Sequence, residues 1–157
     1  MTRILVIGIG NEYARDDAAG LRVARVLKAQ APGGVEIQEQ SGEGTALLES
    51  WKGADAVIII DAANSGRPPG TLHRFDASRE ALPAESFRAS THLVGLREAF
   101  ELARALNRLP PEVVVYAIEG GEFSAGEGLS PELERAIPAA VAAVIGEIGR
   151  ISESLSE

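Results

Sequence analysis

Two kinds of segment alternate along the chain: short runs of consecutive apolar residues, and longer stretches with apolar residues at helical spacing. Ile4–Ile7 and Ala56–Ile60 contain no polar residue, which is typical of strands buried on both faces of a parallel sheet. The alternation in Val35–Gln38 predicts a further strand, Thr71–Phe75 an edge strand, and Val113–Tyr116 the last strand. These strands are separated by segments that read as helices or loops.

Helices are predicted over Asp17–Gln30, after the Ser41–Gly44 loop, from Ser90 or Thr91 onward, and from Pro131 onward. The third ends before a pair of prolines. The fourth carries a long apolar stripe, and Pro138 inside that stripe predicts a kink or a late start.

Strand–helix alternation favours a mostly parallel sheet with helices on both faces. The expectation is one three-layer α/β/α domain over residues 1–151, followed by a polar tail, 152–157, that frays. The polar stretch Asp76–Thr91 is predicted to be a loop, and a loop of that length is usually functional or disordered.

Composition narrows the function. The chain has 157 residues, no cysteine and a formal net charge of −8. Without cysteine there is no disulfide framework, Cys-based metal site or thiol nucleophile. The acidic balance disfavours nucleic acid and anionic membrane surfaces as partners. No apolar run is long enough for a signal peptide or a membrane span, so we expect a soluble, cytoplasmic protein.

In open α/β sheets, ligands collect at the carboxyl ends of the strands. Asp16 and Asp17 lie in the loop after the first strand, Asp61 ends the Ala56–Ile60 run, and His92 begins a helix. One carboxylate of that loop, the carboxylate of Asp61 and the imidazole of His92 on one rim form an oxygen/oxygen/nitrogen set that suits a metal.

Each of these residues also has a plainer interpretation. Asp16 and Asp17 could cap the first helix, and Asp61 could be a hydrogen-bonded turn residue. A lone histidine such as His92 is more often a surface or packing residue, and His73, in an alternating strand, is read that way.

Other chemistries have weaker support. Gly8-Ile9-Gly10 resembles the start of a GxGxxG dinucleotide-binding loop, but Tyr13 occupies the position of the third glycine. The chain has no Gly-x-Ser-x-Gly elbow, HExxH or Walker pattern. A hydrolase on this chain would more naturally use a metal-polarised carbonyl and an activated water.

With these residues assembled, the sequence resembles the hydrogenase maturation proteases, which remove a C-terminal extension from the large subunit of nickel–iron hydrogenases. The resemblance runs from Ile4 to about Leu133 and is carried by several motifs in order. These are Gly8-Ile9-Gly10-Asn11 followed by Asp16-Asp17-Ala18-Ala19-Gly20, Val57–Ala62, Ser90–Leu96, Ile118-Glu119-Gly120 and Gly128–Pro131.

The resemblance implies a twisted five-stranded sheet between helices and places catalytic and metal-recognising residues at Asp17, Asp61 and His92. Ala18 stands where many members have glycine. It also implies that nickel arrives already inserted in the substrate precursor, so the free enzyme need hold none. Asn11 and the Glu39–Gly44 loop, namely Glu39, Gly42, Glu43 and Gly44, are candidates for substrate recognition. Ser41-Gly42-Glu43 departs there from the Asp-Gly-Gly form of many members, and an ordinary glycine turn is the alternative.

The expected mechanism has Asp17, Asp61 and His92 approach the nickel of the precursor while a metal-bound or metal-adjacent water attacks the scissile carbonyl. The expected partner is the hydrogenase large-subunit precursor, and the protein is expected to act on it as a monomer. Two rivals remain: a generic metal-dependent amidohydrolase or peptidase, and a non-catalytic nickel carrier or docking protein.

Overall fold

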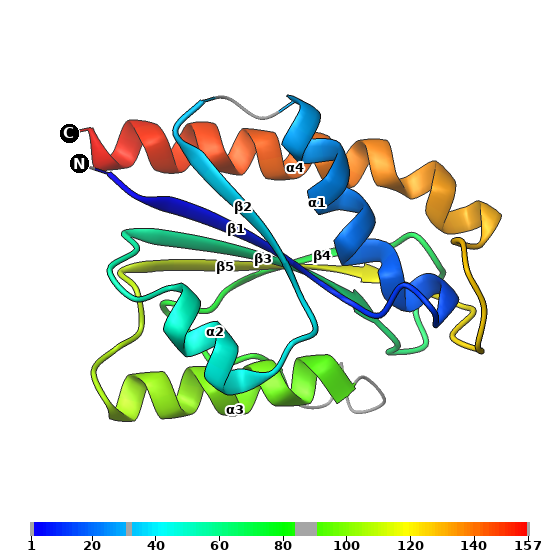
Figure 1. Cartoon of the computed structure of the whole chain (residues 1–157), viewed down its shortest axis with the longest axis horizontal. Helices are drawn as coiled ribbons and strands as arrows, with labels where there is room; N and C mark the ends of the chain where they lie inside the picture. The colour runs from blue at the N-terminus through cyan, green and yellow to red at the C-terminus, as the bar shows by residue number, and fades with distance from the viewer. Residues whose placement is uncertain (1, 31–32, 84–90, 157) are drawn as a thin grey trace.

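A computed structural model of the chain describes residues 2–30, 33–83 and 91–156, and of residues 91–94 only the helical backbone. A five-stranded sheet, in the order β2-β1-β3-β5-β4, lies between two layers of helices (Figure 1). This is the three-layer arrangement that the alternating pattern predicts.

Four strands of the sheet are parallel: β1 (Ile4–Ile9), β2 (Val35–Gln40), β3 (Ala56–Ala63) and β5 (Glu112–Glu119). The edge strand β4 (Leu72–Asp76) pairs antiparallel with β5. The predictions of a mostly parallel sheet and of an edge strand in this region are therefore confirmed.

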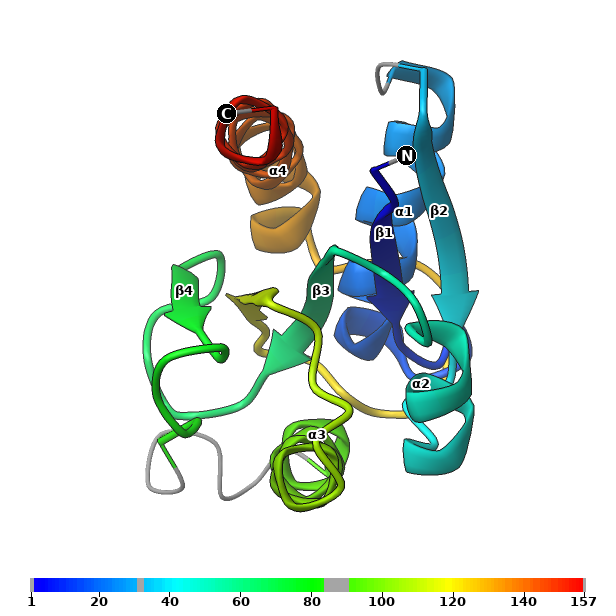
Figure 2. The same ribbon diagram turned by 90° about the vertical axis from the view of Figure 1, so that its left-hand side faces the viewer.

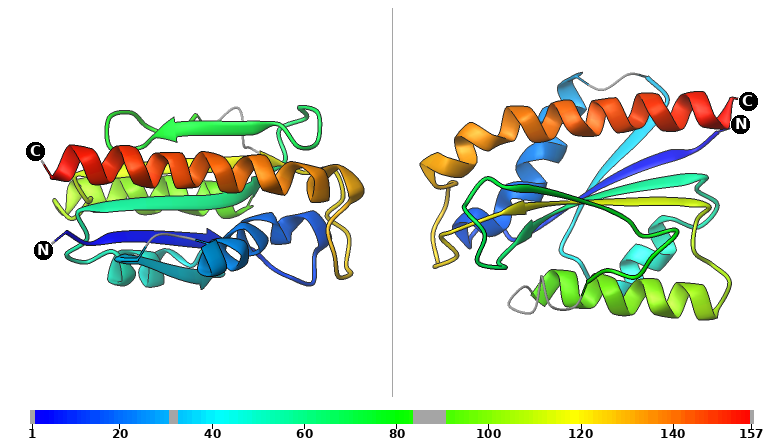
Figure 3. Two further views of the ribbon diagram at one scale, coloured as in Figure 1. Left: turned by 90° about the horizontal axis from the view of Figure 1, so that it is seen from above. Right: turned by 180° about the vertical axis from the view of Figure 1, so that it is seen from behind.

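Helices cover both faces of the sheet. On one face lie α1 (Ala19–Gln30), which follows the 3-10 turn η1 (Arg15–Ala18), and α4 (Pro131–Leu155). On the other lie α2 (Gly44–Ser50) and α3 (Thr91–Ala105) (Figure 2). Seen from above, α4 runs the length of the molecule (Figure 3). Among the described residues, no helix is both long enough and apolar enough to cross a membrane.

Side chains alternate between the two helical layers along each strand. In β3, Ile58 and Ile60 pack with α1 and α4, whereas Val57 and Ile59 pack with α2 and α3. Because both faces are covered, every residue of β3 is buried, which explains the uninterrupted apolar run Ala56–Ile60. Asp61 lies between Ile60 and Ala62, so it faces the layer of α2 and α3.

The order of the strands creates a switch point between β1 and β3. From β1 the chain passes through α1 to β2 on one side, whereas from β3 it continues to β4 and β5 on the other. Chains that leave adjacent parallel strands in opposite directions open a crevice at their carboxyl ends, where ligands bind in such folds. Asp17 follows β1 and Asp61 lies near the end of β3, so both belong to this crevice.

The last helix begins at Pro131, as predicted, and continues through Pro138, so the alternative of a late start was wrong. Buried residues on both sides of the proline, such as Ile137 and Val141, hold the helix on the sheet. It also continues to Leu155 instead of fraying from Ser152, since Ile151 and Leu155 pack on the core. Of the expected 76–91 loop, residues 84–90 lie outside the described part of the chain.

Candidate functional site

Two glycines allow the loop after β1 to approach the sheet closely. A Cβ on Gly10 would lie 2.3 Å from the carbonyl oxygen of Asp17, and a Cβ on Gly20 would lie 2.3 Å from that of Ile60. Both contacts are with backbone atoms, so no side-chain rotation could relieve them. The glycines therefore let η1 and the start of α1 lie directly against the ends of β1 and β3.

Asp17 and Asp61 are positioned by this close packing. Asp17 lies three residues before Gly20, and Asp61 directly follows Ile60, the residue that Gly20 touches. Asp17 is half-buried, and its Oδ2 accepts a hydrogen bond of 3.0 Å from the backbone N–H of Asn11. Asp61 is fully buried, and its Oδ1 accepts one of 2.8 Å from the N–H of Ala62. The structure thus places two of the three predicted ligands at the switch point.

His92 lies in the first turn of α3, the helix that covers the face towards which Asp61 points. A Cβ on Gly95, less than one turn further along, would lie 3.8 Å from the carbonyl oxygen of Gly42, in the loop that follows β2. The start of α3 therefore lies at the same edge of the sheet as the carboxylates. The side chain of His92 is outside the described part of the structure.

Asp16 does not cap the first helix, so that interpretation was wrong. Its buried carboxylate accepts hydrogen bonds from the backbone N–H groups of Gly121 (2.9 Å), Glu122 (2.9 Å) and Ser130 (2.7 Å) and from the Ser130 hydroxyl (2.9 Å). Burial alone would raise the pKa of Asp16, but these hydrogen bonds together lower it below its ordinary value. Asp16 thereby fastens the 120–130 loop next to Asp17.

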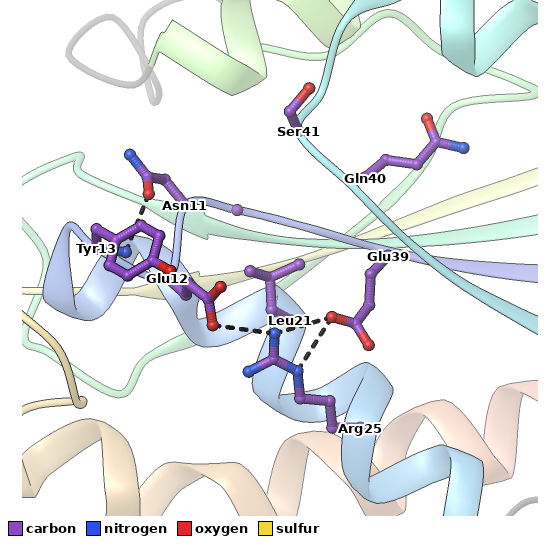
Figure 4. A pocket seen from close by; sticks show the side chains of 9 residues that line it. Asn11, Glu12, Tyr13, Leu21, Arg25, Glu39, Gln40 and Ser41 are labelled. Atoms are coloured by element: carbon purple, nitrogen blue, oxygen red, sulfur yellow. Dashed lines mark hydrogen bonds and ion pairs between the residues drawn. The ribbon is translucent and has the colours of Figure 1, made fainter.

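An open hollow of about 490 Å³ lies beside Asn11, between the loop after β1, α1 and the end of β2. Figure 4 shows the Arg25 guanidinium between Glu12 and Glu39 on its wall, with Tyr13 near Asn11. Arg25 lies 3.0 Å from Glu39 and 3.4 Å from Glu12. The hydrogen bond from Lys28, followed by that from Arg25, lowers the pKa of Glu39. Two of the predicted recognition residues, Asn11 and Glu39, thus line one hollow.

The rest of the predicted recognition loop lies next to this hollow. Gly42 has a φ of +95°, a left-handed conformation that favours glycine. Glu43 is the N-cap of α2, where its carboxylate accepts hydrogen bonds from the N–H groups of Thr45 (3.0 Å) and Ala46 (2.8 Å). These two hydrogen bonds lower the pKa of Glu43. Gly44 begins α2 and lies close to Ala99 of α3.

A third buried carboxylate, besides Asp61 and Asp16, ends β5. Glu119 accepts hydrogen bonds from the backbone N–H and the hydroxyl of Ser65, and it contacts Nε2 of His73 at 3.1 Å. The interpretation of His73 as a surface or packing residue missed this contact, because the alternating sequence of β4 does not reveal a partner 46 positions away. The available signal was a glutamate at the end of an apolar run, where a buried carboxylate needs partners.

Among the described residues, no group of three or more His, Asp or Glu side chains is close enough together to hold a metal ion. Asp17 and Asp61 offer carboxylate oxygens, which are hard ligands.

The sheet order and the two carboxylates at its switch point define a small α/β protein with acidic side chains at the carboxyl ends of its central strands. Within that class, the chain belongs to the hydrogenase maturation protease family, whose model matches residues 21–147. It is therefore a member of a peptidase family, in accord with the resemblance of its motifs.

Individual relatives agree with this assignment. The structure of the hydrogenase maturating endopeptidase HybD from Escherichia coli superposes with a TM-score of 0.84 at 29% identity, covering 95% of this chain and 93% of that one. The [NiFe] hydrogenase maturation protease HybD from Thermococcus kodakarensis gives a TM-score of 0.69 at 27% identity, over 99% and 100% of the two chains. Hydrogenase expression/formation protein HupD from Thiocapsa roseopersicina is 27% identical over 88% of this chain, which spans 64% of that protein's length.

Proposed function

We propose that this protein is an endopeptidase that removes the C-terminal extension of a nickel–iron hydrogenase large-subunit precursor after nickel has been inserted. The observation that carries the proposal is the convergence of Asp17 and Asp61 on the switch point of a chain that belongs to this family. Its relatives are named as hydrogenase maturation proteases and endopeptidases.

Nickel is part of the substrate in this proposal. Asp17, Asp61 and His92 of the enzyme approach the nickel centre of the precursor, and that contact aligns the nearby peptide bond. The carboxylates contribute negative charge and lone pairs, and Asp61, deep in the crevice, is protected from competing water. Water then attacks the scissile carbonyl. Gating by nickel follows directly, because a precursor without the metal offers these side chains nothing to bind.

The polypeptide next to the nickel centre would lie in the hollow beside Asn11. The hollow is open, polar on the side of Arg25 and Glu39, and bordered by the exposed aromatic ring of Tyr13, features that suit an extended peptide. The Gly42–Gly44 loop lies between this hollow and α3, so it would contact the same segment. Glu43 also caps α2, so a test of its role in substrate recognition needs a substitution such as Glu43→Ser that retains capping.

The experiment is mass spectrometry of a nickel-loaded large-subunit precursor incubated with this protein, with nickel-free precursor in a parallel sample. Loss of a C-terminal peptide in the nickel-loaded sample alone would support both the cleavage and its gating by nickel. Cleavage of both samples would retain the protease but exclude recognition of the metal.

The same experiment separates the rivals. A generic metal-dependent peptidase would also cleave an unrelated unfolded protein added as a control. A carrier or docking protein would co-elute with the precursor and leave its mass unchanged. Either result would contradict the proposed function.

A further inference from the structure

A cluster of Ser65, His73 and Glu119 lies at the same edge of the sheet as the candidate site, and the function proposed for Asp17, Asp61 and His92 gives this cluster no role. Glu119 is fully buried, while the His73 side chain is 15% exposed. His73 therefore connects an interior carboxylate with the surface of the crevice edge. Its ring also stacks on Phe75, with centroids 6.2 Å apart, which restricts its orientation from a second side.

The strand register brings His73 into line with Asp61. Ala117 of β5 pairs with Asp61 of β3 on one side and with His73 of β4 on the other. Neighbouring strands are about 4.8 Å apart, so the backbones of Asp61 and His73 are separated by roughly 10 Å.

The two side chains also share a face of the sheet. Phe75, two residues after His73, packs with the α2 and α3 layer, as do the residues on either side of Asp61 at the same parity, Ile59 and Ala63. Residues two apart in a strand point to the same face. Asp61 and His73 thus lie on either side of Ala117, whose side chain is only a methyl group.

Hydrogen-bond chemistry fixes which nitrogen of His73 carries the proton. Glu119 accepts from both donors of Ser65, and a carboxylate has only acceptor capacity to offer a third group. The Nε2 of His73 is therefore the donor in the 3.1 Å contact. In a neutral imidazole the lone pair then belongs to Nδ1, the arrangement by which a carboxylate orients a histidine base.

We propose that His73, oriented by Glu119, is the general base of the cleavage reaction; this inference rests on the proposed function. Asp17, Asp61 and His92 are occupied with the nickel centre, and the attacking water must lose a proton elsewhere. The water oxygen bonds to the carbonyl carbon as its proton passes to Nδ1 of His73. The imidazolium then gives that proton to the amide nitrogen as the C–N bond breaks. The new carboxylic acid releases the second proton of the water to the freed amine, which leaves a carboxylate and an ammonium group.

The first test does not depend on cleavage. Because the chain contains 2 histidines, a sample labelled with ¹⁵N-histidine gives only two imidazole spin systems, and His73→Gln assigns them. We expect the spectrum of neutral His73 to show the proton on Nε2. Glu119→Gln should weaken that preference, because the amide can also donate. A proton on Nδ1 in the wild-type protein would overturn the proposal.

The second test uses nickel-loaded precursor. His73→Gln should lower kcat by about 10²–10⁴-fold, the usual contribution of a general base, and leave KM and the melting temperature near wild type. Free imidazole should restore part of the activity of His73→Ala, a rescue that a packing role would not allow. Arg79→Gln, on the exposed turn after β4, is the control and should cleave normally.

The outcomes distinguish this role from the function on which it rests. Wild-type cleavage together with an equally active His73→Gln would overturn the role of His73 and leave the protease in place. Absence of cleavage by the wild-type protein would overturn the proposed function and the general base with it.

Discussion

The carboxylate of Asp16 accepts both the backbone N–H and the hydroxyl of Ser130, a residue 114 positions further along the chain. These two bonds join the start of the α1 segment to the start of α4. Two more, from Gly121 and Glu122, close the 120–130 loop over the same carboxylate. One acid thus determines the path of a loop that borders the candidate site, while its neighbour Asp17 is directed towards Asn11.

Asp16→Ala should therefore be strongly destabilising. It leaves three backbone N–H groups without their acceptor, and the loss should be on the order of 3 kcal/mol or more in the free energy of unfolding. Urea denaturation measures it. Ser130→Ala removes only the hydroxyl bond and should cost about 1 kcal/mol. Equal, small effects of both substitutions would show that the loop is held by other contacts.

Gly20→Ala should move the first helix away from the sheet. The added methyl would lie 2.3 Å from the carbonyl oxygen of Ile60 and 2.4 Å from that of Ile9, both of them backbone atoms. We expect a loss of about 1–3 kcal/mol, the usual cost of overpacking. Gly146→Ala is the matched control, because that glycine lies in a helix with nothing within 4 Å of the added methyl. It should stabilise the protein by about 0.5–1 kcal/mol, and thermal unfolding of both variants decides the matter.

Stability should fall in acid because of Glu147, a buried residue of α4. Burial opposes its charge, but hydrogen bonds from Arg74, Tyr116 and Arg150 lower its pKa from 4.5 to about 2. Burial, followed by the hydrogen bond to Glu147, raises the pKa of Tyr116 to about 12. A carboxyl group with a lower pKa in the folded state contributes stability that is present above pH 4.5 and is lost as the pH falls towards 2.

The full contribution of Glu147 is about 3 kcal/mol, and Glu147→Gln should remove the corresponding slope of unfolding free energy between about pH 5 and pH 2. Glu134→Gln, on the same helix, breaks an exposed ion pair with Arg22 and should cost less than about 1 kcal/mol at any pH. An unchanged acid slope in Glu147→Gln would place the acid sensitivity in other carboxylates.

Local patterns predicted the elements of this fold well, because burial on both faces leaves a clear trace in the sequence. The all-apolar runs of β1 and β3 indicate central strands, and those strands do occupy the middle of the sheet beside β5. The order of the strands in the sheet could not be predicted in this way. It depends on which helix packs on which face of the sheet, and the sequence of a single segment does not show this.

Prediction of the site was limited for the same reason. Asp17 follows β1 and Asp61 lies near the end of β3, so the rule for open α/β sheets places them at one edge. The roles of Asp16 and Glu119 were missed because their partners, Ser130 and Ser65, are 114 and 54 positions away. Two adjacent aspartates at a helix start also look alike in sequence, and only the fold distinguishes the carboxylate that fastens a loop from the one that faces the crevice.

Asp17→Asn should abolish cleavage of nickel-loaded precursor and leave the fold intact. The substitution removes the charge that approaches the nickel centre, and even partners outside a metal's own ligands are worth about 10–100-fold, so a direct contact should cost at least that much. The melting temperature should stay near wild type, because Asp17 is half-buried and asparagine can still accept the hydrogen bond from the Asn11 N–H.

Glu127→Gln removes one exposed negative charge from the 120–130 loop and serves as the control for net charge. Mass spectrometry of the precursor against time gives the rates. Full cleavage by Asp17→Asn would remove this residue from the site, whereas loss of cleavage in both variants would indicate that overall charge, rather than Asp17, governs the encounter with the precursor.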